Sequence, residues 1–322
     1  MEEGASCCMP SRNASVVHTI SGPMVSSHGR HVIPQAVIPA GAFLMGDSTG
    51  DENPGDGETP AHEVFVDEFT IDMTSVTNAQ FAAFVADTGY RTEAEVFGFS
   101  AVFHLAVDAP EEDIMGPAAG TPWWFGVRGA DWSHPGGQRT SLENLADHPV
   151  VHISWNDASA YCTWAQRALP TEAQWEKASR GGLDSMRYPW GSTLGDLATG
   201  AWPCNIWQGS FPRLNTAEDG WLTTAPVESF EPNGFGLWQT VGNIWEWCAD
   251  WFSADYYGLS PRSGPRGPDT GAARVLRGGS YLCHDSYCNR YRNSARSSNT
   301  PDSSMANAGF RTVGLDSGSS LS

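Results

Sequence analysis

Two cysteines near the C-terminus have the side-chain type and the spacing to bind a soft metal ion. Cys283 and Cys288 lie five positions apart, between a Gly-Gly-Ser turn at residues 278–280 and a basic, tyrosine-rich segment. Thiolates suit a soft ion such as Cu(I), which accepts two of them in a near-linear arrangement and leaves room for a third sulfur. A disulfide, or two buried structural cysteines, would satisfy the same spacing. The spacing alone therefore leaves open whether the pair is reduced, oxidised or bound to metal.

Two other stretches carry oxygen donors of the kind that hard cations prefer. Glu246 follows a Gly-Asn turn at residues 242–243, and Asn205 precedes a loop that contains Asp219. Carboxylate, amide and backbone carbonyl oxygens are the usual ligands of Ca²⁺. Neither stretch has EF-hand spacing, so a plain hydrogen-bonded turn is the competing interpretation at both.

Other signatures of catalysis are weak or missing. His284, beside the first cysteine, is a candidate ligand or proton carrier, although a single loop histidine is usually neither. The sequence has no glycine-rich dinucleotide fingerprint, no P-loop and no nucleophile-elbow serine. The spacing of its cysteines fits no zinc finger.

The composition is that of an acidic, loop-rich globular protein. The 322 residues are 40% hydrophobic, carry a formal net charge of −19, and include 14 Trp, 35 Gly and 21 Pro. This is enough apolar material for a sizeable core, and the many turn formers favour an irregular fold. The acidic charge argues against binding to nucleic acid or anionic membranes and is compatible with a basic peptide partner.

The cysteines and the N-terminal residues indicate the cytoplasm. Of the seven cysteines, Cys7 and Cys8 lie in the expected leader, three are scattered, and Cys283 and Cys288 form the close pair of the folded part, which is not the pattern of a disulfide scaffold. Glu2 and Glu3 are not followed by the apolar run of a signal peptide. No stretch approaches the roughly 18 apolar residues of a spanning helix. We therefore expect a soluble, monomeric protein without a membrane partner.

One folded domain is expected over residues 35–315. Residues 1–34 have the composition of an unstructured leader and residues 316–322 that of a flexible tail. Short strands are predicted within 37–46, 62–67 and 69–73, where apolar residues alternate.

Three helices are predicted from the residues at their ends. Each begins with an N-cap Ser or Thr that is followed three positions later by Gln or Asp, as in a capping box. They begin after Thr77, Ser154 and Thr171, and end at Gly89, before Pro170, and at Gly181. Residues 91–147 contain many Gly and Pro, together with Trp123, Trp124, Phe125 and Trp132. We expect there a long, aromatic-rich loop that either lines the site or covers the surface.

Taken together, these segments resemble the formylglycine-generating enzymes, also called sulfatase-modifying factors, of the actinobacterial kind. The resemblance covers about residues 37–314. Its specific marker is the two-cysteine segment at 278–288, whereas Leu-Pro-Thr-Glu-Ala at 169–173 and Gly-Asn-x-Trp-Glu-Trp at 242–247 place a chain only in the wider superfamily. The other matching segments are residues 38–41, 148–158, 205–209 and 299–304.

The resemblance implies a fold and a reaction. The fold would be a single α+β domain with little regular secondary structure, of the formylglycine-generating-enzyme or C-type-lectin-like kind. The reaction would use O₂ to convert the cysteine of an unfolded sulfatase Cys-x-Pro-x-Arg segment to Cα-formylglycine. Cys283 and Cys288 would hold Cu(I), and the substrate cysteine would join as a third thiolate. Hydrogen would leave the substrate Cβ, and the resulting thioaldehyde would hydrolyse.

Further site residues follow from the same resemblance. Ser280, Tyr287 and Trp245 would line the pocket for substrate and oxygen, the two hydroxyls as hydrogen-bond donors and the indole as an apolar wall. Two structural Ca²⁺ sites are implied, held largely by backbone carbonyl oxygens. They would use Asn205, Ile206, Asp219 and Trp221, and Gln239, Gly242, Ile244 and Glu246.

The sequence departs from the family pattern at several of these positions. Gln239 stands where relatives often have Asn, which weakens the expectation for the second Ca²⁺ site. Secreted relatives have structural disulfides, but Ser179, Asn293 and Thr312 occupy three of those cysteine positions here and leave Cys162 without its partner. This departure agrees with a reducing compartment.

Two other functions are compatible with the same scaffold. A C-type-lectin-like module would bind a peptide without turnover, since a fold does not guarantee a function. The paired cysteines weigh against it. A relative of the non-heme iron sulfoxide synthases would need a His-rich metal site on a separate helical domain, and the sequence contains no such domain.

Overall fold

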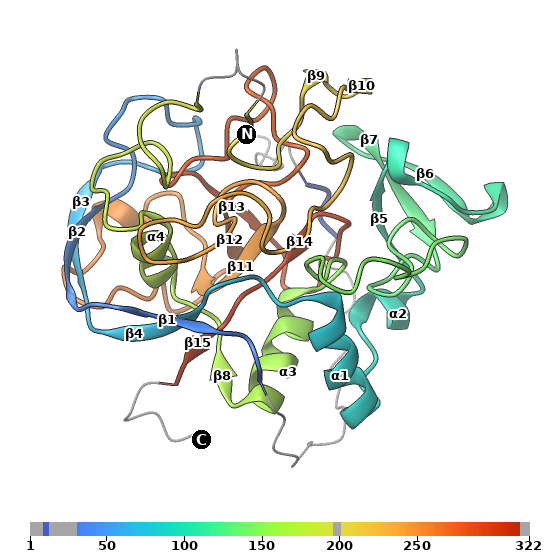
Figure 1. Cartoon of the computed structure of the whole chain (residues 1–322), viewed down its shortest axis with the longest axis horizontal. Coiled ribbons are helices and arrows are strands. Elements are labelled where there is room, and N and C mark those ends of the chain that lie inside the picture. The colour runs from blue at the N-terminus through green and yellow to red at the C-terminus, as the bar shows by residue number, and fades with distance from the viewer. Residues whose placement is uncertain (1–8, 13–30, 196–200, 316–322) are drawn as a thin grey trace.

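The structure, a computed structural model, describes residues 9–12, 31–195 and 201–315. Short strands and helices are joined by long irregular segments (Figure 1). The described strands form five small sheets of two to four strands each. This arrangement confirms the predicted α+β class with little regular secondary structure. The helices are α1 (Asn78–Thr88), α2 (Glu93–Phe97), α3 (Trp155–Ala165) and α4 (Glu172–Ser179).

The three predicted helices are confirmed as α1, α3 and α4. Thr77, Ser154 and Thr171 each accept a hydrogen bond from the backbone three residues on, and each capping box is complete. α1 ends at Gly89, whose φ of 67° is left-handed. α4 ends at Ser179, two residues before Gly181, which is also left-handed at φ 59°. These ends were predictable because each cap is built from residues adjacent in the chain.

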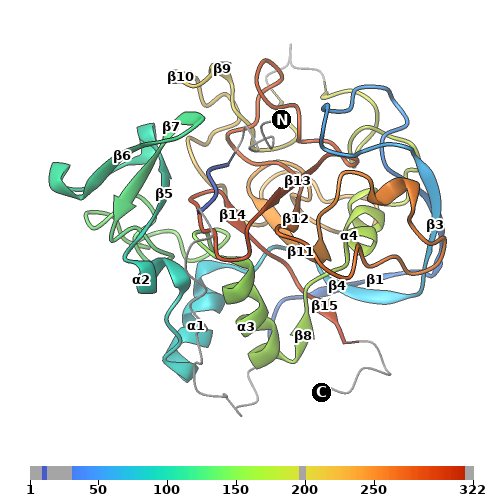
Figure 2. The same cartoon turned by 180° about the vertical axis from the view of Figure 1, so that it is seen from behind.

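The expectation of a long loop over residues 91–147 was wrong. This segment contains α2 and a three-stranded sheet in the order β5-β7-β6, which lies at one edge of the molecule (Figures 1 and 2). The strands are β5 (Phe99–Phe103), β6 (Ile114–Ala118) and β7 (Thr121–Arg128). β6 contains a glycine and a proline and is nowhere fully buried. It therefore lacks the apolar alternation by which strands are recognised in sequence.

A central sheet carries the segment with the two cysteines. Its order is β13-β12-β11-β14, and the two cysteines lie between β12 and β13. The strands are β11 (Trp245–Trp251), β12 (Arg274–Arg277), β13 (Arg296–Asn299) and β14 (Ala308–Gly309). Trp175 of α4 donates its indole N–H to Glu246 of β11 at 2.7 Å, which joins helix and sheet.

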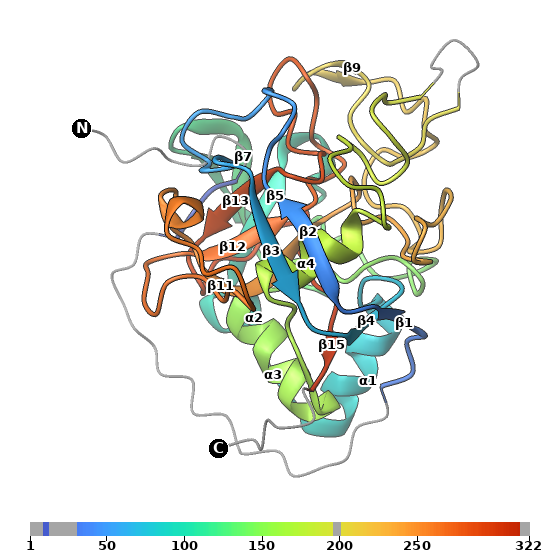
Figure 3. The same ribbon diagram turned by 90° about the vertical axis from the view of Figure 1, so that its left-hand side faces the viewer.

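Two further sheets lie on the other side of α4. β2 (Gly41–Met45) pairs with β3 (His62–Val66), and Figure 3 shows this pair next to α4. The sheet β1-β4-β15-β8 brings both ends of the domain together. Its strands are β1 (Gln35–Ile38), β4 (Phe69–Asp72), β8 (Arg167–Ala168) and β15 (Val313–Gly314), and the remaining short pair is β9 (Gly209–Ser210) with β10 (Leu214–Asn215). The predicted early strands are thereby confirmed.

Part of the expected leader packs onto the domain. Met9 and Ile33 are buried in the main hydrophobic cluster. Arg12 donates to the carbonyl of Phe99 at 2.8 Å and to the hydroxyl of Ser304 at 3.0 Å. The expectation of an unstructured leader therefore does not hold for residues 9–12 and 31–34. The rest of that segment, and the tail from 316, lie outside the described residues. No helix in the described ranges is long and apolar enough to cross a membrane.

Candidate active site

The two cysteines meet because the chain folds back on itself after β12. Gly278 and Gly279 have left-handed φ values of 95° and 74°. A Cβ atom on Gly279 would lie 2.9 Å from the carbonyl oxygen of Arg290, so only glycine fits this close approach. The backbone N–H of Cys283 donates to the carbonyl of Ser280 at 2.9 Å, and that of Cys288 donates to the carbonyl of His284 at 2.6 Å. These turns place the two sulfurs 3.3 Å apart.

The distance between the sulfurs describes a reduced dithiol. A disulfide would have a bond of about 2.0 Å, and both cysteines are free. Each is only 1% exposed. Two buried soft donors fit a soft monovalent ion and do not fit a hard cation.

The charge balance around the dithiol favours the protonated thiols when no ion is bound. Burial raises the pKa of Cys283 well above its ordinary value, and the neighbouring Cys288 raises it further. The backbone N–H of Ser280, 3.4 Å from the Cys283 sulfur, and the guanidinium of Arg290 act in the opposite direction. Binding of a metal ion would therefore release protons from this pair.

A narrow aromatic cleft leads to the dithiol. Tyr287 stacks on Phe211 with ring centroids 4.3 Å apart and planes within 8°. Trp123 meets Tyr287 edge-on at 4.8 Å. The cleft between these side chains is too narrow for a water molecule, so a peptide must separate the rings to enter. Its lining residues are Trp123, Trp124, Phe211, Ser280, Leu282, Cys283, Tyr287, Cys288 and Asn307.

The hydroxyl of Ser280 is oriented by two donors. Its oxygen accepts hydrogen bonds from the backbone N–H of Leu282 at 3.3 Å and from the side-chain amide of Asn307 at 2.9 Å. Because both acceptor positions are occupied, the hydroxyl hydrogen is available to donate to a group in the cleft. The side-chain oxygen of Asn307 is buried and has no partner among the described residues.

The structure brings together four of the five predicted catalytic residues. Ser280, Cys283, Tyr287 and Cys288 all line the cleft. Trp245 does not belong to this lining. It is fully buried at the start of β11, where its backbone N–H donates to the carbonyl of Asn307 at 2.8 Å.

Of the two remaining candidates for the cleft, His284 does not line it and the aromatic segment after residue 120 does. His284 faces Ser286 and Asp285, at 2.7 and 3.2 Å, and is not part of the cleft lining. Trp123 and Trp124 do line the cleft, as one of the two interpretations of residues 91–147 expected.

Three residues of the site have no signal in the sequence around the cysteines, and a fourth, Arg290, lies in the basic segment that follows them. Phe211 and Asn307 lie on separate segments and reach the cleft only through the fold. Arg290 places a guanidinium nitrogen 3.7 Å from the Cys288 sulfur and forms an ion pair with Asp56. Asp56 is 234 positions away in the chain, so no local pattern relates the two.

Protein donors hold Asp219 of the first predicted Ca²⁺ set. The carboxylate of Asp219 accepts hydrogen bonds from the backbone N–H of Ile206 at 3.1 Å and of Trp221 at 2.9 Å. The side-chain oxygen of Asn205 is buried without a described partner, and the carbonyl of Ile206 is in contact with the amide of Gln208. Burial raises the pKa of Asp219. Carboxylate, amide and carbonyl oxygens are the donor types that a hard cation prefers. Asp219 also accepts from the side-chain amide of Gln208 at 2.8 Å, and Ca²⁺ at this set stays a prediction.

The second predicted Ca²⁺ set fits less well. The side-chain oxygen of Gln239 is buried and unpartnered in the described part of the chain. Gly242 and Ile244 offer only backbone carbonyls. The carboxylate of Glu246 is fully engaged by protein donors: Arg311 Nε at 2.7 Å and Nη2 at 2.8 Å, Trp175 Nε1 at 2.7 Å and Ser75 Oγ at 2.8 Å. The structure therefore gives this carboxylate a structural role, and as it stands it is not free to bind a cation.

The fold and the site together define a class: a single α+β domain with a buried dithiol at the base of an aromatic cleft. The profile of the Sulfatase-modifying factor enzyme 1-like domain matches residues 24–314. The chain is 63% identical to the formylglycine-generating enzyme of Streptomyces coelicolor over 277 residues, 86% of this chain and 88% of that protein. It is 56% identical to the Thermomonospora curvata enzyme of the same name, over 85% of this chain and 91% of that one. The chain belongs to the sulfatase-modifying factor family.

Two less similar proteins show how far the fold and the activity can be inferred from similarity. PvdO from Pseudomonas aeruginosa superimposes with a TM-score of 0.62 at 23% identity, covering 87% of this chain and 93% of that one, which supports a common fold. A bovine relative named inactive C-alpha-formylglycine-generating enzyme 2 is 40% identical over 92% of this chain and 93% of its own. Membership of the wider family therefore does not by itself establish activity.

Proposed function

We propose that this protein converts the cysteine of a Cys-x-Pro-x-Arg segment, in an unfolded sulfatase, to Cα-formylglycine with O₂ as co-substrate. The observation that carries the proposal is the reduced pair Cys283/Cys288, with sulfurs 3.3 Å apart at the base of the cleft. The names of the relatives that share more than half of its residues support the same substrate.

The two cysteines would hold Cu(I). When bound, Cu(I) supplies a soft site for the substrate thiolate and the redox chemistry that O₂ requires. The chain itself supplies the rest. The two sulfurs would bind the ion and release their protons, and the aromatic rings would exclude water. Ser280, held by Asn307, presents a donor hydrogen where negative charge develops. Tyr287 is placed at the same wall of the cleft.

Recognition of the peptide would combine shape and charge. A substrate cysteine reaches the dithiol only in an extended, unfolded segment that parts Tyr287 from Phe211. The acidic chain, at a net charge of −19, attracts the arginine of the motif. Cys162, Cys204 and Cys248 are buried free thiols, which is typical of a reducing compartment. We place the protein in the cytoplasm as a monomer, with Ca²⁺ at the Asn205–Asp219 site as a structural ion.

The proposal is tested by incubating the purified, copper-loaded full chain with a Cys-x-Pro-x-Arg peptide under O₂. The expected result is a mass loss of about 18 Da on the peptide, the difference between cysteine and formylglycine. Cys288→Ser should abolish the loss. Cys162→Ser, a change at a buried cysteine of α3, should retain it. If copper is verified in the site and the peptide keeps its mass, the proposal is wrong.

The non-catalytic module is the second candidate, and the inactive bovine relative is the observation that favours it. It predicts peptide binding without mass change, and equal binding by wild-type protein and Cys288→Ser. The same incubation, followed by a binding measurement, separates the two functions.

A further inference from the structure

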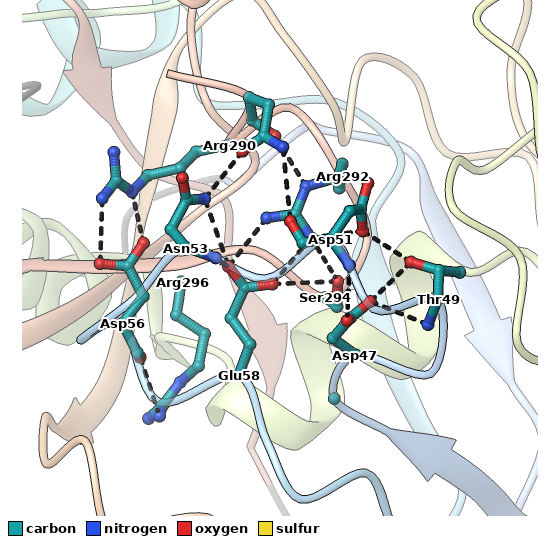
Figure 4. Close-up of polar contacts among 12 residues, drawn as sticks. Asp47, Thr49, Asp51, Asn53, Asp56, Glu58, Arg290, Arg292, Ser294 and Arg296 are labelled. Atoms are coloured by element: carbon teal, nitrogen blue, oxygen red, sulfur yellow. Dashed lines mark hydrogen bonds and ion pairs between the residues drawn. The ribbon is translucent and has the colours of Figure 1, made fainter. Parts of the chain in front are cut away.

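An acidic segment far from the cysteines lies against the chain that follows them. We call residues 47–58, the loop between β2 and β3, the acidic clamp. Figure 4 shows its side chains facing those of residues 290–296. The contacts are Asp56 with Arg290, Asn53 with Asn289 at 2.8 Å, Glu58 with Arg292 at 2.8 Å and with Ser294 at 3.2 Å, and the carbonyl of Gly57 with Arg296 at 2.8 Å.

One of these contacts continues to the dithiol. Asp56 binds Arg290 in a bidentate manner, with its oxygens 2.5 Å from Nε and 3.0 Å from Nη2. The third nitrogen, Nη1, donates to the sulfur of Cys288 at 3.7 Å. Because the guanidinium is planar and rigid, fixing two nitrogens on the carboxylate also fixes the direction of the third. The side chain of Arg290 is 7% exposed, so water screens its charge only weakly.

We propose that Arg290 is the charge-balancing partner of the Cys288 thiolate, and that Asp56 of the acidic clamp is its positioning residue. Two thiolates around a monovalent cation carry a net negative charge, and here both sulfurs are 1% exposed. Burying such a charge is unfavourable unless an opposite charge is close. The contact with Nη1 supplies that charge. The inference rests on the proposed function, because it requires Cys288 to act as a thiolate ligand.

Attachment of the loop alone does not account for this geometry. Arg292 pairs with Glu58 and both side chains are fully buried. Arg187 pairs with Asp51 at 2.6 Å and lies over the ring of Tyr188. These two arginines attach the acidic clamp without reaching a sulfur. Arg290 is the arginine of this group whose described contacts join the carboxylate and the thiol.

The test is an anaerobic competition titration of Cu(I) between the full chain and a chromophoric Cu(I) chelator, with no peptide and no O₂. Arg290→Gln should weaken Cu(I) binding about tenfold to a hundredfold, the range typical of groups that support a metal ligand. Arg290→Lys keeps the charge but loses the planar fork that contacts Asp56 and Cys288 together, so it should restore only part of the affinity. Arg187→Gln removes an arginine and an ion pair from the same loop, so it is the matched control and should bind Cu(I) like wild type. Thermal unfolding of each variant reports whether the fold is kept.

The role of Asp56 is tested by combining two changes. In an Asp56→Asn background, Arg290→Gln should weaken Cu(I) binding less than in wild type, because the guanidinium is no longer aimed at the sulfur. Equal affinity of wild type and Arg290→Gln, or an equal loss in Arg187→Gln, would overturn the inference. Wild-type protein that oxidises the peptide while Arg290→Gln binds Cu(I) normally would refute only this inference. Wild-type protein that leaves the peptide unchanged would refute the proposed function itself.

Discussion

The carboxylate of Glu176 binds Arg277, the last residue before the segment that contains the two cysteines. One of its oxygens accepts from the backbone N–H of Gly46 at 2.9 Å and from Arg180 at 2.7 and 3.0 Å, and the other accepts from Arg277 at 2.5 Å. Arg277 ends β12 directly before Gly278. Burial alone would raise the pKa of Glu176, but the guanidiniums of Arg180 and Arg277 outweigh it and hold the pKa below its ordinary value.

Glu176→Gln keeps the shape of this side chain and removes its charge. Glu176 and Arg277 are both fully buried. Removing one partner of a buried ion pair typically costs about 3–5 kcal/mol, because the other charge stays buried. Arg277 keeps a second carboxylate partner, Glu172 at 2.8 Å, so its charge is then compensated only in part. With a urea m-value of about 3 kcal/mol/M, the unfolding midpoint would fall by roughly 1–2 M. A change of this size is a large fraction of the stability of a domain.

The measurement is equilibrium unfolding in urea at pH 7, followed by tryptophan fluorescence. The matched control is Glu63→Gln. Glu63 is 52% exposed and pairs with Arg262 at the surface, so its loss should cost at most about 1 kcal/mol. A midpoint for Glu176→Gln that moves no further than that of Glu63→Gln would refute the reasoning. Because the folded pKa of Glu176 is depressed, its contribution is present above about pH 4 and is lost as the pH falls further. The difference between wild type and variant should therefore shrink in acid.

Two further outcomes are expected. Burial raises the pKa of the Asp250 carboxyl to about 7. Because the folded pKa lies above the unfolded one, the free energy of unfolding falls as the pH rises from about 4 to 7. In urea unfolding, wild type should therefore lose about 2 kcal/mol more than Asp250→Asn between pH 5 and pH 8. Equal losses in the two proteins would contradict this assignment. Asn307→Ala removes the donor that orients Ser280, so the rate of peptide oxidation should fall about fivefold, equivalent to about 1 kcal/mol, with Cu(I) affinity unchanged. An unchanged rate would show that the Ser280 hydroxyl needs no such support.

Much of the site was predictable where its parts are adjacent in sequence. The spacing of Cys283 and Cys288 and the preceding Gly-Gly-Ser turn indicated a close sulfur pair, and the structure has it at 3.3 Å. Ser280 and Tyr287 were implied by the resemblance of the same segment to the family. Trp245 was expected in the cleft and is not part of its lining. The reason is that strand β11 turns this side chain into the core, a direction that the sequence of the strand alone does not reveal.

The two predicted Ca²⁺ ligand sets also differ in how far distant parts of the chain affect them. Asp219 reaches the backbone N–H of Ile206, the residue that follows Asn205. Glu246 has the residue type of a cation ligand, but Arg311 reaches it from 65 positions away and occupies both of its oxygens. A competing partner that distant leaves no trace in the local pattern.

The sequence by itself determined α1, α3, α4, the early strands and the closeness of Cys283 and Cys288, because capping boxes, apolar alternation and glycine turns act between residues a few positions apart. Tertiary structure alone decided the sheet within residues 91–147, the aromatic cleft and the pairing of Asp56 with Arg290. Each of these depends on contacts between distant segments that are favourable only once the chain is compact. The charge next to the two sulfurs and the opening through which a ligand reaches them are therefore set by residues that are close in space but distant in the sequence.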